Sequence, residues 1–278
     1  MEHSMGHILP DGAHVEAKQG SATVYRVDYP DGWWADRDYM WVSNVGCRED
    51  EEAAGTPVSY GGASVDFKES LFEKSAYVYD NELATFGAML CMAAGRGEQE
   101  ICQLFYQLGI EDANIENFNY GGENAFSIAH LPIRLNGEEM NLMFIVVRGS
   151  VVDREFIGDH FAKSNREFLG YMAYDYVEDF EKKVWEAVKE YANGHEDLYD
   201  KPRTFFITGH SLGGATANLI TALANNPETG NSWIFMDTDV SRIFTYTYGA
   251  IDSIKVDAPV TTGYQNIHNI YNFFDTYG

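Results

Sequence analysis

The chain has 278 residues, of which 45% are apolar, and a formal net charge of −24. This apolar content is enough for a sizeable core and excludes a chain that is disordered throughout. The negative charge argues against nucleic acid and anionic membrane surfaces as partners, because both would repel the protein. No apolar run approaches the roughly 18 residues of a transmembrane helix, and the first residues lack the basic and apolar regions of a signal peptide. We expect a soluble protein, either cytoplasmic or secreted after removal of a signal.

Turn-rich sequence occupies residues 1–75, with strand-like pieces at 22–27 and 40–42. We interpret this part as an N-terminal elaboration, rich in loops and β-structure. The core is then expected over residues 76–278, with both parts in one structural domain.

The histidines and cysteines of the first half predict no metal site and no disulfide framework. His3, His7 and His14 are spaced too irregularly for metal ligands. The chain has three cysteines, and an odd, small number does not suggest paired bridges. Cys91 and Cys102 fall in predicted amphipathic helices, which favours buried free thiols.

Two helices and three strands are predicted next. Asp80 can cap the first helix, and the second ends before Gly109. Apolar residues recur in them at helical spacing, at Leu83, Phe86, Leu90 and Ala94 and then at Ile101, Leu104, Phe105 and Leu108. The strands cover 115–120, 125–135 and 141–147, and Asn136-Gly137 between the last two is a strong hairpin signal. The last strand is continuously apolar, as expected for a strand buried on both faces.

The stretch 204–215 reads TFFITGHSLGGA and follows a long predicted helix over 176–192. It has the G-x-S-x-G pattern of a nucleophile elbow, in which a strand turns sharply into a helix and presents a serine. Ser211 is therefore the candidate nucleophile. Gly209 and Gly213 support the elbow because side chains there would collide with the close-packed strand and helix.

The residue after the candidate nucleophile has its own predicted role. The backbone N–H of Leu212 and the positive end of the helix dipole would favour a developing oxyanion. The alternative is a G-x-S-x-G pattern that occurs by chance in a β–α turn.

The sequence GHSLGGA at residues 209–215 resembles the elbow motif of the class 3 lipase family. These proteins are α/β-hydrolases related to fungal triacylglycerol lipases. The two predicted helices resemble those of bacterial members of the family. The resemblance implies an α/β fold with a central, mostly parallel sheet flanked by helices. It also implies a serine carboxylester hydrolase that needs no metal or organic cofactor. In this family a central strand ends in Arg-Gly-Ser or Arg-Gly-Thr, matched here by residues 148–150. By this resemblance Ser150 is a second oxyanion-hole donor. His210 is adjacent to the nucleophile in the elbow, so its side chain is expected to point away from the serine and to take a structural role.

Two further family landmarks follow the strand end and the elbow. Residues 151–165 correspond to the lid of lipases, whose apolar face covers the serine, although a plain surface helix is an equal alternative. A strand over 267–274 ends at Asp275, which the resemblance makes the triad acid. The alternative for Asp275 is a solvated aspartate at a strand end. The family's Thr-Tyr-Gly-x-Pro strand end is matched only in part, because Ile251 and Asp252 replace the usual Pro and Arg.

No histidine in the sequence matches the family's base, which follows the aspartate. The sequence ends at Gly278 without a further histidine. His268 lies too far before Asp275 along an extended strand, and His130, His160 and His195 precede the elbow. We expect a chain that lacks its C-terminal portion and is nearly inactive as an esterase, with a natural, catalytically dead relative as the second explanation.

Other functions stay open beside the lipase or esterase. A non-catalytic lipase-like binding protein would share the elbow but lack the base. A thioesterase, peptidase or acyltransferase could use the same elbow. The expected partner is an ester or lipid substrate, whose acyl length and alcohol the sequence does not give.

Overall fold

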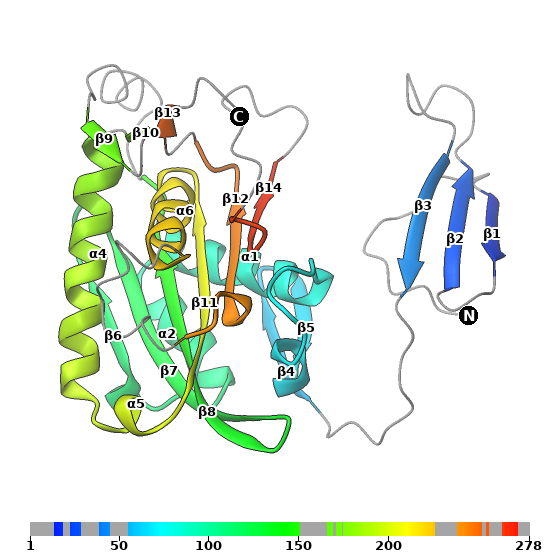
Figure 1. The fold of residues 1–278 in the computed structure, drawn as a ribbon. Helices are drawn as coiled ribbons and strands as arrows, with labels where there is room; N and C mark the ends of the chain where they lie inside the picture. The colour runs from blue at the N-terminus through cyan, green and yellow to red at the C-terminus, as the bar shows by residue number, and fades with distance from the viewer. Residues whose placement is uncertain are drawn as a thin grey trace. The chain divides into compact units, whose positions relative to one another are not determined.

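Figure 1 shows the computed structural model of the chain. It describes residues 14–18, 23–28, 39–44, 55–150, 166–168, 171–173, 175–225, 238–251, 254–255 and 263–271. By their internal contacts the residues form two units, Met1–Ala53 and Ala54–Gly278. The predicted grouping of residues 1–75 around a core in one domain stays a prediction.

The first unit contains a three-stranded antiparallel sheet. Its strands are β1 (His14–Lys18), β2 (Thr23–Asp28) and β3 (Tyr39–Asn44), in that order. The predicted strand at 22–27 overlaps β2, and the predicted strand at 40–42 lies within β3.

The second unit is built on a six-stranded sheet with the order β14-β12-β11-β8-β7-β6. These strands are β6 (Ile115–Phe118), β7 (Phe126–Leu135), β8 (Glu138–Val147), β11 (Arg203–His210), β12 (Ile243–Tyr248) and β14 (Ile267–Ile270). The four strands from β14 to β8 are parallel, while β7 and β6 add antiparallel pairings at one edge. Smaller sheets pair β4 (Thr56–Tyr60) with β5 (Ala63–Phe67), and join β13 (Ile254–Lys255), β10 (Tyr171–Ala173) and β9 (Arg166–Phe168).

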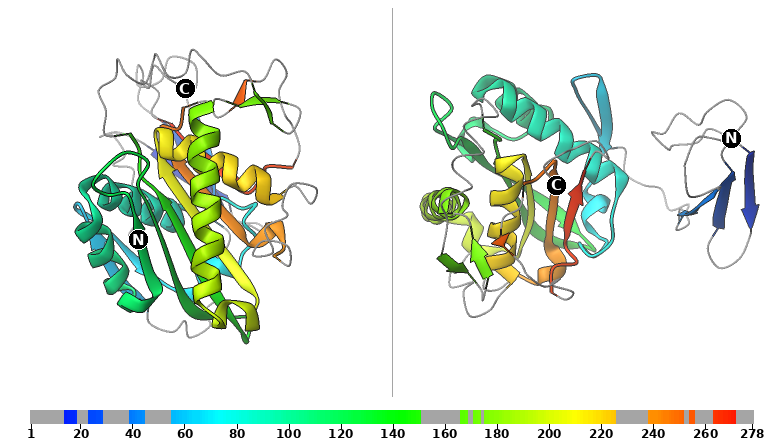
Figure 2. Two further views of the ribbon diagram at one scale, coloured as in Figure 1. Left: turned by 90° about the vertical axis from the view of Figure 1, so that its left-hand side faces the viewer. Right: turned by 90° about the horizontal axis from the view of Figure 1, so that it is seen from above.

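Helices cover both faces of the six-stranded sheet (Figures 1 and 2). On one face lie α1 (Asn81–Arg96) and α2 (Glu98–Gln107), and on the other lie α4 (Asp175–Gly194) and α6 (Leu212–Asn225). Short helical turns are α5 (Asp197–Asp200), η1 (Glu69–Phe72), η2 (Asp112–Asn114) and η3 (Val240–Arg242). The predicted α/β class, with a central, mostly parallel sheet flanked by helices, is confirmed.

The central strands are buried on both faces, which explains their continuous apolar sequence. In β11, Phe205 and Ile207 pack against α4 and α6, while Phe206 packs into the cluster that contains α1 and α2. Because side chains of a strand alternate between the two faces, each face needs its own apolar residues. The same alternation in β8 produces the run of apolar residues from which this strand was predicted.

Local signals in the sequence set the ends of several elements. The Asp80 carboxylate accepts hydrogen bonds from the backbone N–H groups of Glu82 at 2.9 Å and Leu83 at 3.2 Å, so it caps α1 as predicted. Asn136 and Gly137 both have positive φ, 51° and 83°, as a two-residue hairpin turn between β7 and β8 requires. Cys91 is buried in α1, and Cys102 in α2 is half-buried; both are free thiols.

Helices in the described part of the chain include none that is long and apolar enough to cross a membrane.

Candidate active site

Ser211 lies at the junction between β11 and α6. Its φ is 54°, in the left-handed region that costs a non-glycine residue energy. Two backbone hydrogen bonds hold this conformation. The Ser211 N–H donates to the Tyr248 carbonyl at 2.9 Å, and the Ser211 carbonyl accepts from the Ala215 N–H at 3.0 Å. Hydrogen bonds therefore connect the turn both to the neighbouring strand β12 and to the first turn of α6.

The glycines on either side of Ser211 lie where no side chain fits. A Cβ on Gly209 would be 2.2 Å from the Gly213 carbonyl oxygen, and a Cβ on Gly213 would be 2.3 Å from the Val147 carbonyl oxygen. Both distances are shorter than real Cβ contacts, and both partners are backbone atoms that cannot swing away. The first turn of α6 therefore packs directly against the backbone of β11 and β8.

The end of β8 lies beside this elbow, although about 60 residues separate them in the sequence. A Cβ on Gly149 would be 2.7 Å from the His210 carbonyl oxygen and 3.2 Å from its Nδ1. The register pairs Val147 with Gly209, so the two strands end at the same level. This is the edge of a parallel sheet at which the carboxyl ends of strands present functional groups.

Ser150 and Leu212 line one pocket at this edge. The structure thus brings together the two residues predicted as oxyanion-hole donors. The pocket is completed by Glu123, Asn124, Arg148, Gly149 and Phe180. Leu212 begins a 14-residue helix, so its N–H is at the positive end of the helix dipole.

Asn124, Arg148 and Phe180 are pocket residues for which the sequence predicted no role. Asn124 belongs to the turn between β6 and β7 and has a φ of 59°. Phe180 reaches the pocket from α4. Only Arg148 had a local signal, since it precedes the Gly149-Ser150 strand end.

Several predicted residues lie outside the described residues. They are Asp275, His160 and the whole of the predicted lid, 151–165. The predicted strand over 267–274 is observed as β14, whose last described strand residue, Ile270, pairs with Tyr248 next to the elbow.

His130, His195 and His268 have partners away from Ser211. His268 packs its ring against Tyr246 and Tyr79, and its Nε2 lies 2.9 Å from the Ala76 carbonyl oxygen. His210 itself ends β11 with an exposed side chain that lies along Gly149.

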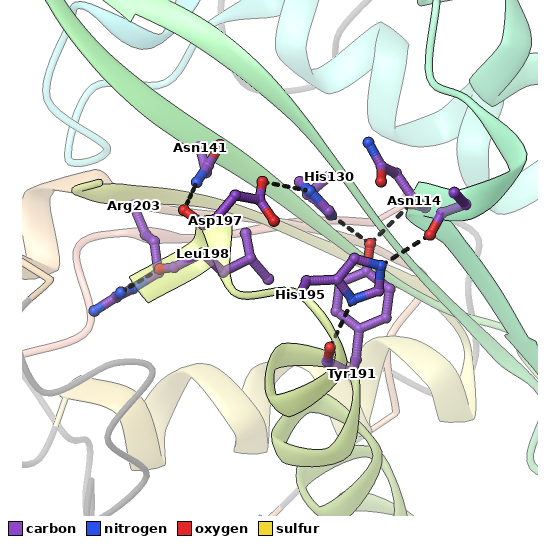
Figure 3. A network of polar contacts seen from close by, with 9 residues as sticks. Asn114, His130, Asn141, Tyr191, His195, Asp197, Leu198 and Arg203 are labelled. Carbon is purple, nitrogen blue, oxygen red and sulfur yellow. Dashed lines mark hydrogen bonds and ion pairs between the residues drawn. The ribbon is translucent and has the colours of Figure 1, made fainter. Parts of the chain in front are cut away.

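A polar network holds His130 and His195 (Figure 3). The His130 Nδ1 lies 2.5 Å from the Tyr191 hydroxyl, and its Nε2 lies 3.1 Å from the Asp197 carboxylate. The His195 nitrogens lie 2.6 Å from the Tyr191 carbonyl oxygen and 2.8 Å from that of Ala113.

This network lies at the opposite end of the sheet from the elbow. Arg203, the first residue of β11, and Asn141 are neighbours in register and bond to the backbone of residues 197 and 198. Ser211 follows the last residue of the same strand. The network is therefore structural and supplies no base to the serine.

The buried imidazole of this network predicts a pH dependence of stability. Burial lowers the pKa of His130 from its usual value near 6.5; His195 lowers it too, and Asp197 opposes both. As the pH falls below roughly 6.5, the unfolded chain binds a proton that the folded chain does not, so the free energy of unfolding should fall. Each unit of pKa difference is worth about 1.4 kcal/mol. Urea unfolding of the protein and of His130→Gln at several pH values between roughly 5 and 8 measures this term.

The variant separates His130 from other titrating groups, because all carboxylates and His195 remain in it. We expect the wild type to lose more stability than His130→Gln on acidification, and Asp197→Asn to lose more still. Parallel curves for the wild type and His130→Gln would contradict the assignment.

Residues 144–270 match the family model of class 3 lipases. A native Rhizomucor miehei lipase propeptide complex is 16% identical, with 81% of this chain and 70% of that chain covered and a TM-score of 0.46. A lipase from Rhizopus microsporus var. chinensis is 14% identical, with coverages of 72% and 62% and a TM-score of 0.38. Lipase II from Rhizopus niveus is 16% identical, with coverages of 66% and 62% and a TM-score of 0.38.

The chain thus spans less than two thirds of the length of the two Rhizopus lipases. A comparison with curated proteins found no match. The family match extends from the middle of β8, through the Arg-Gly-Ser strand end and the elbow, to the end of β14. The matched segment, residues 144–270, is therefore similar to class 3 lipases.

Proposed function

We propose that this protein is a carboxylic ester hydrolase of the lipase or esterase type, with Ser211 as its nucleophile. The observation that carries the proposal is the junction of β11 and α6, which holds a serine at a φ of 54° beside the pocket of Ser150 and Leu212. A serine at this position, with backbone donors next to it, is the arrangement that acyl transfer requires. The class 3 lipase match over 144–270 supports ester hydrolysis at the level of the family.

In the proposed reaction the Ser211 hydroxyl attacks the carbonyl carbon of the ester. The negative charge that forms on the carbonyl oxygen is stabilised by the backbone N–H groups of Ser150 and Leu212 and by the dipole of α6. The alcohol leaves and an acyl group remains on Ser211. Water then attacks the acyl-enzyme, and the free acid is released. Asp275 would orient the base that accepts the serine proton.

The mechanism needs a base that accepts the proton of the Ser211 hydroxyl. None of the three histidines whose hydrogen-bond partners are described can serve as that base. His130, His195 and His268 are held by other groups. We therefore propose that the 278-residue chain hydrolyses esters only slowly by itself. The same observation favours one second candidate, a lipase-like protein that binds an ester or lipid without cleaving it.

Covalent labelling with a fluorophosphonate tests both candidates, because this reagent modifies only a serine that acts as a nucleophile. We expect slow labelling of one site, found at Ser211 by peptide mass spectrometry, and faster labelling when imidazole is added as an external base. Labelling at another residue would contradict the proposed nucleophile. A chain that binds an ester analogue but is not labelled, with or without imidazole, would support the binding protein.

Hydrolysis of an ester and a thioester with the same acyl group then distinguishes the reaction classes. An esterase or lipase should prefer the oxygen ester after correction for its different intrinsic reactivity. A preference for the thioester would indicate the alternative thioesterase.

A further inference from the structure

Arg148 directly follows β8 and binds the turn between β6 and β7. The residue is 6% exposed. Its Nη1 donates to the Tyr120 carbonyl at 3.3 Å, and its Nη2 donates to the Gly122 carbonyl. The guanidinium also lies 5.3 Å from the centre of the Tyr120 ring, within the range of a cation–π interaction. One planar group therefore joins the end of β8 to two carbonyls and one ring of the same turn.

The Tyr120 hydroxyl fastens this turn to the sheet. It lies 2.7 Å from the Ser127 Oγ on β7, and Ser127 donates its own hydrogen to the Asn117 Oδ1 on β6 at 2.6 Å. Since a serine hydroxyl has one hydrogen, Tyr120 is the donor in the first of these bonds. Asn117 donates from its Nδ2 to the Cys102 Sγ of α2 at 3.0 Å. The chain of hydrogen bonds thus runs in one direction from the turn, through β7 and β6, to α2.

The strand end that Arg148 anchors carries Ser150, a proposed oxyanion donor. Between them, Gly149 lies so close to the elbow that an added Cβ would be 2.7 Å from the His210 carbonyl oxygen. The pocket that Ser150 and Leu212 line has a cavity volume of about 10 Å³, which is room for about one water molecule. In a space this small, a slight shift of the strand end would close the pocket or separate its two donors.

We propose that Arg148 and Tyr120 are positioning residues for the candidate active site. Tyr120 fixes Arg148, and Arg148 fixes the strand end that presents Ser150 to the reacting carbonyl. Arginine suits this task because its planar fork binds two carbonyl oxygens and stacks on an aromatic ring at the same time, whereas lysine does not. The effect on rate rests on the proposed function, but the anchoring of the strand end does not.

The rate of fluorophosphonate labelling at a fixed imidazole concentration measures the effect on the reaction. Its dependence on reagent concentration separates the limiting rate, which reports transition-state stabilisation, from the half-saturating concentration, which reports binding. In Arg148→Met we expect the limiting rate to fall on the order of 10²-fold, with little change in the half-saturating concentration. Arg148→Lys and Tyr120→Phe should lose less, because lysine keeps the charge and phenylalanine keeps the ring.

Tyr106→Phe serves as the control for the loss of a tyrosine hydroxyl. Tyr106 is an exposed residue of α2, and its hydroxyl donates to the Asp112 carboxylate rather than to the turn that binds Arg148. This variant should be labelled at the wild-type rate.

Hydrogen exchange measures the anchoring itself and needs no reaction. In Arg148→Met and Tyr120→Phe, the amides of residues 149–150 and of the turn at 119–124 should exchange faster than in the wild type. The amides of α4 should be unchanged, because this helix has no part in the chain of bonds.

Several results would overturn the proposal. One is a folded Arg148→Met that is labelled at the wild-type limiting rate, and another is a loss confined to the half-saturating concentration. Should Arg148→Met fail to fold, Tyr120→Phe decides the question, since it has to be labelled more slowly than Tyr106→Phe. If the wild type itself is not labelled, the proposed function fails; unchanged exchange at 149–150 would then overturn the anchoring as well, and faster exchange would support it.

Discussion

Ser211→Ala should abolish fluorophosphonate labelling and lower imidazole-assisted ester hydrolysis by roughly 10³-fold or more. The substitution removes the only atom that can form the acyl bond in the proposed mechanism. Alanine at a φ near 54° is no more strained than serine, so the fold should persist. Intact-protein mass spectrometry measures the adduct, and circular dichroism checks the fold.

Ser211→Gly is the matched control, because it removes the same hydroxyl but relieves the left-handed strain at this position. It should be equally unreactive, yet more resistant to unfolding by about 1 kcal/mol. A loss of reactivity together with a gain in stability would show that the strained backbone at residue 211 lowers stability while it positions the nucleophile. Labelling of Ser211→Ala near the wild-type level would refute Ser211 as nucleophile.

Gly213→Ala should cause a large loss of stability for a single added methyl group. The new Cβ would lie 2.3 Å from the Val147 carbonyl oxygen and 2.7 Å from that of Arg148. Neither atom can move without shifting β8, so α6 would have to lift from the sheet. We expect a loss of roughly 3 kcal/mol or more, which lowers the melting temperature by roughly 6–12 °C.

Gly95→Ala is the control for a methyl group added to a helix. Gly95 lies in α1, and its Cβ would meet nothing within 4 Å. There alanine should raise stability by up to about 1 kcal/mol. Differential scanning calorimetry of both variants gives the comparison. Equal melting temperatures for Gly213→Ala and the wild type would mean that the close contact between α6 and β8 is wrong.

The parts of the fold that the sequence predicts are those with strong local causes. The hairpin at Asn136-Gly137 follows from two residues that tolerate positive φ, and the start of α1 follows from a carboxylate that caps it. The burial of β8 follows from an apolar run that leaves no polar face. In each case the residues that cause the structure lie within a few positions of it.

The pocket could be predicted only in part, because its residues converge from four places in the chain. The strand end at Ser150 and the elbow at Leu212 carry recognisable motifs. Asn124 and Phe180 carry none, since a turn asparagine and a helical phenylalanine have the same local sequence whether or not they face a site. Their positions depend on the register of β7 with β8 and on how α4 packs against the sheet, neither of which is encoded locally.

The contact between α6 and β8 has a consequence for anyone who wishes to redesign the pocket. One side of it is built from main chain at Gly149 and from the start of α6, where the spacing leaves no room for a single added carbon near Gly213. The lining also includes the side chains of Asn124 and Phe180. Libraries that alter ligand preference should therefore vary α4 and the turn before β7, and leave the glycines of the elbow and strand end untouched.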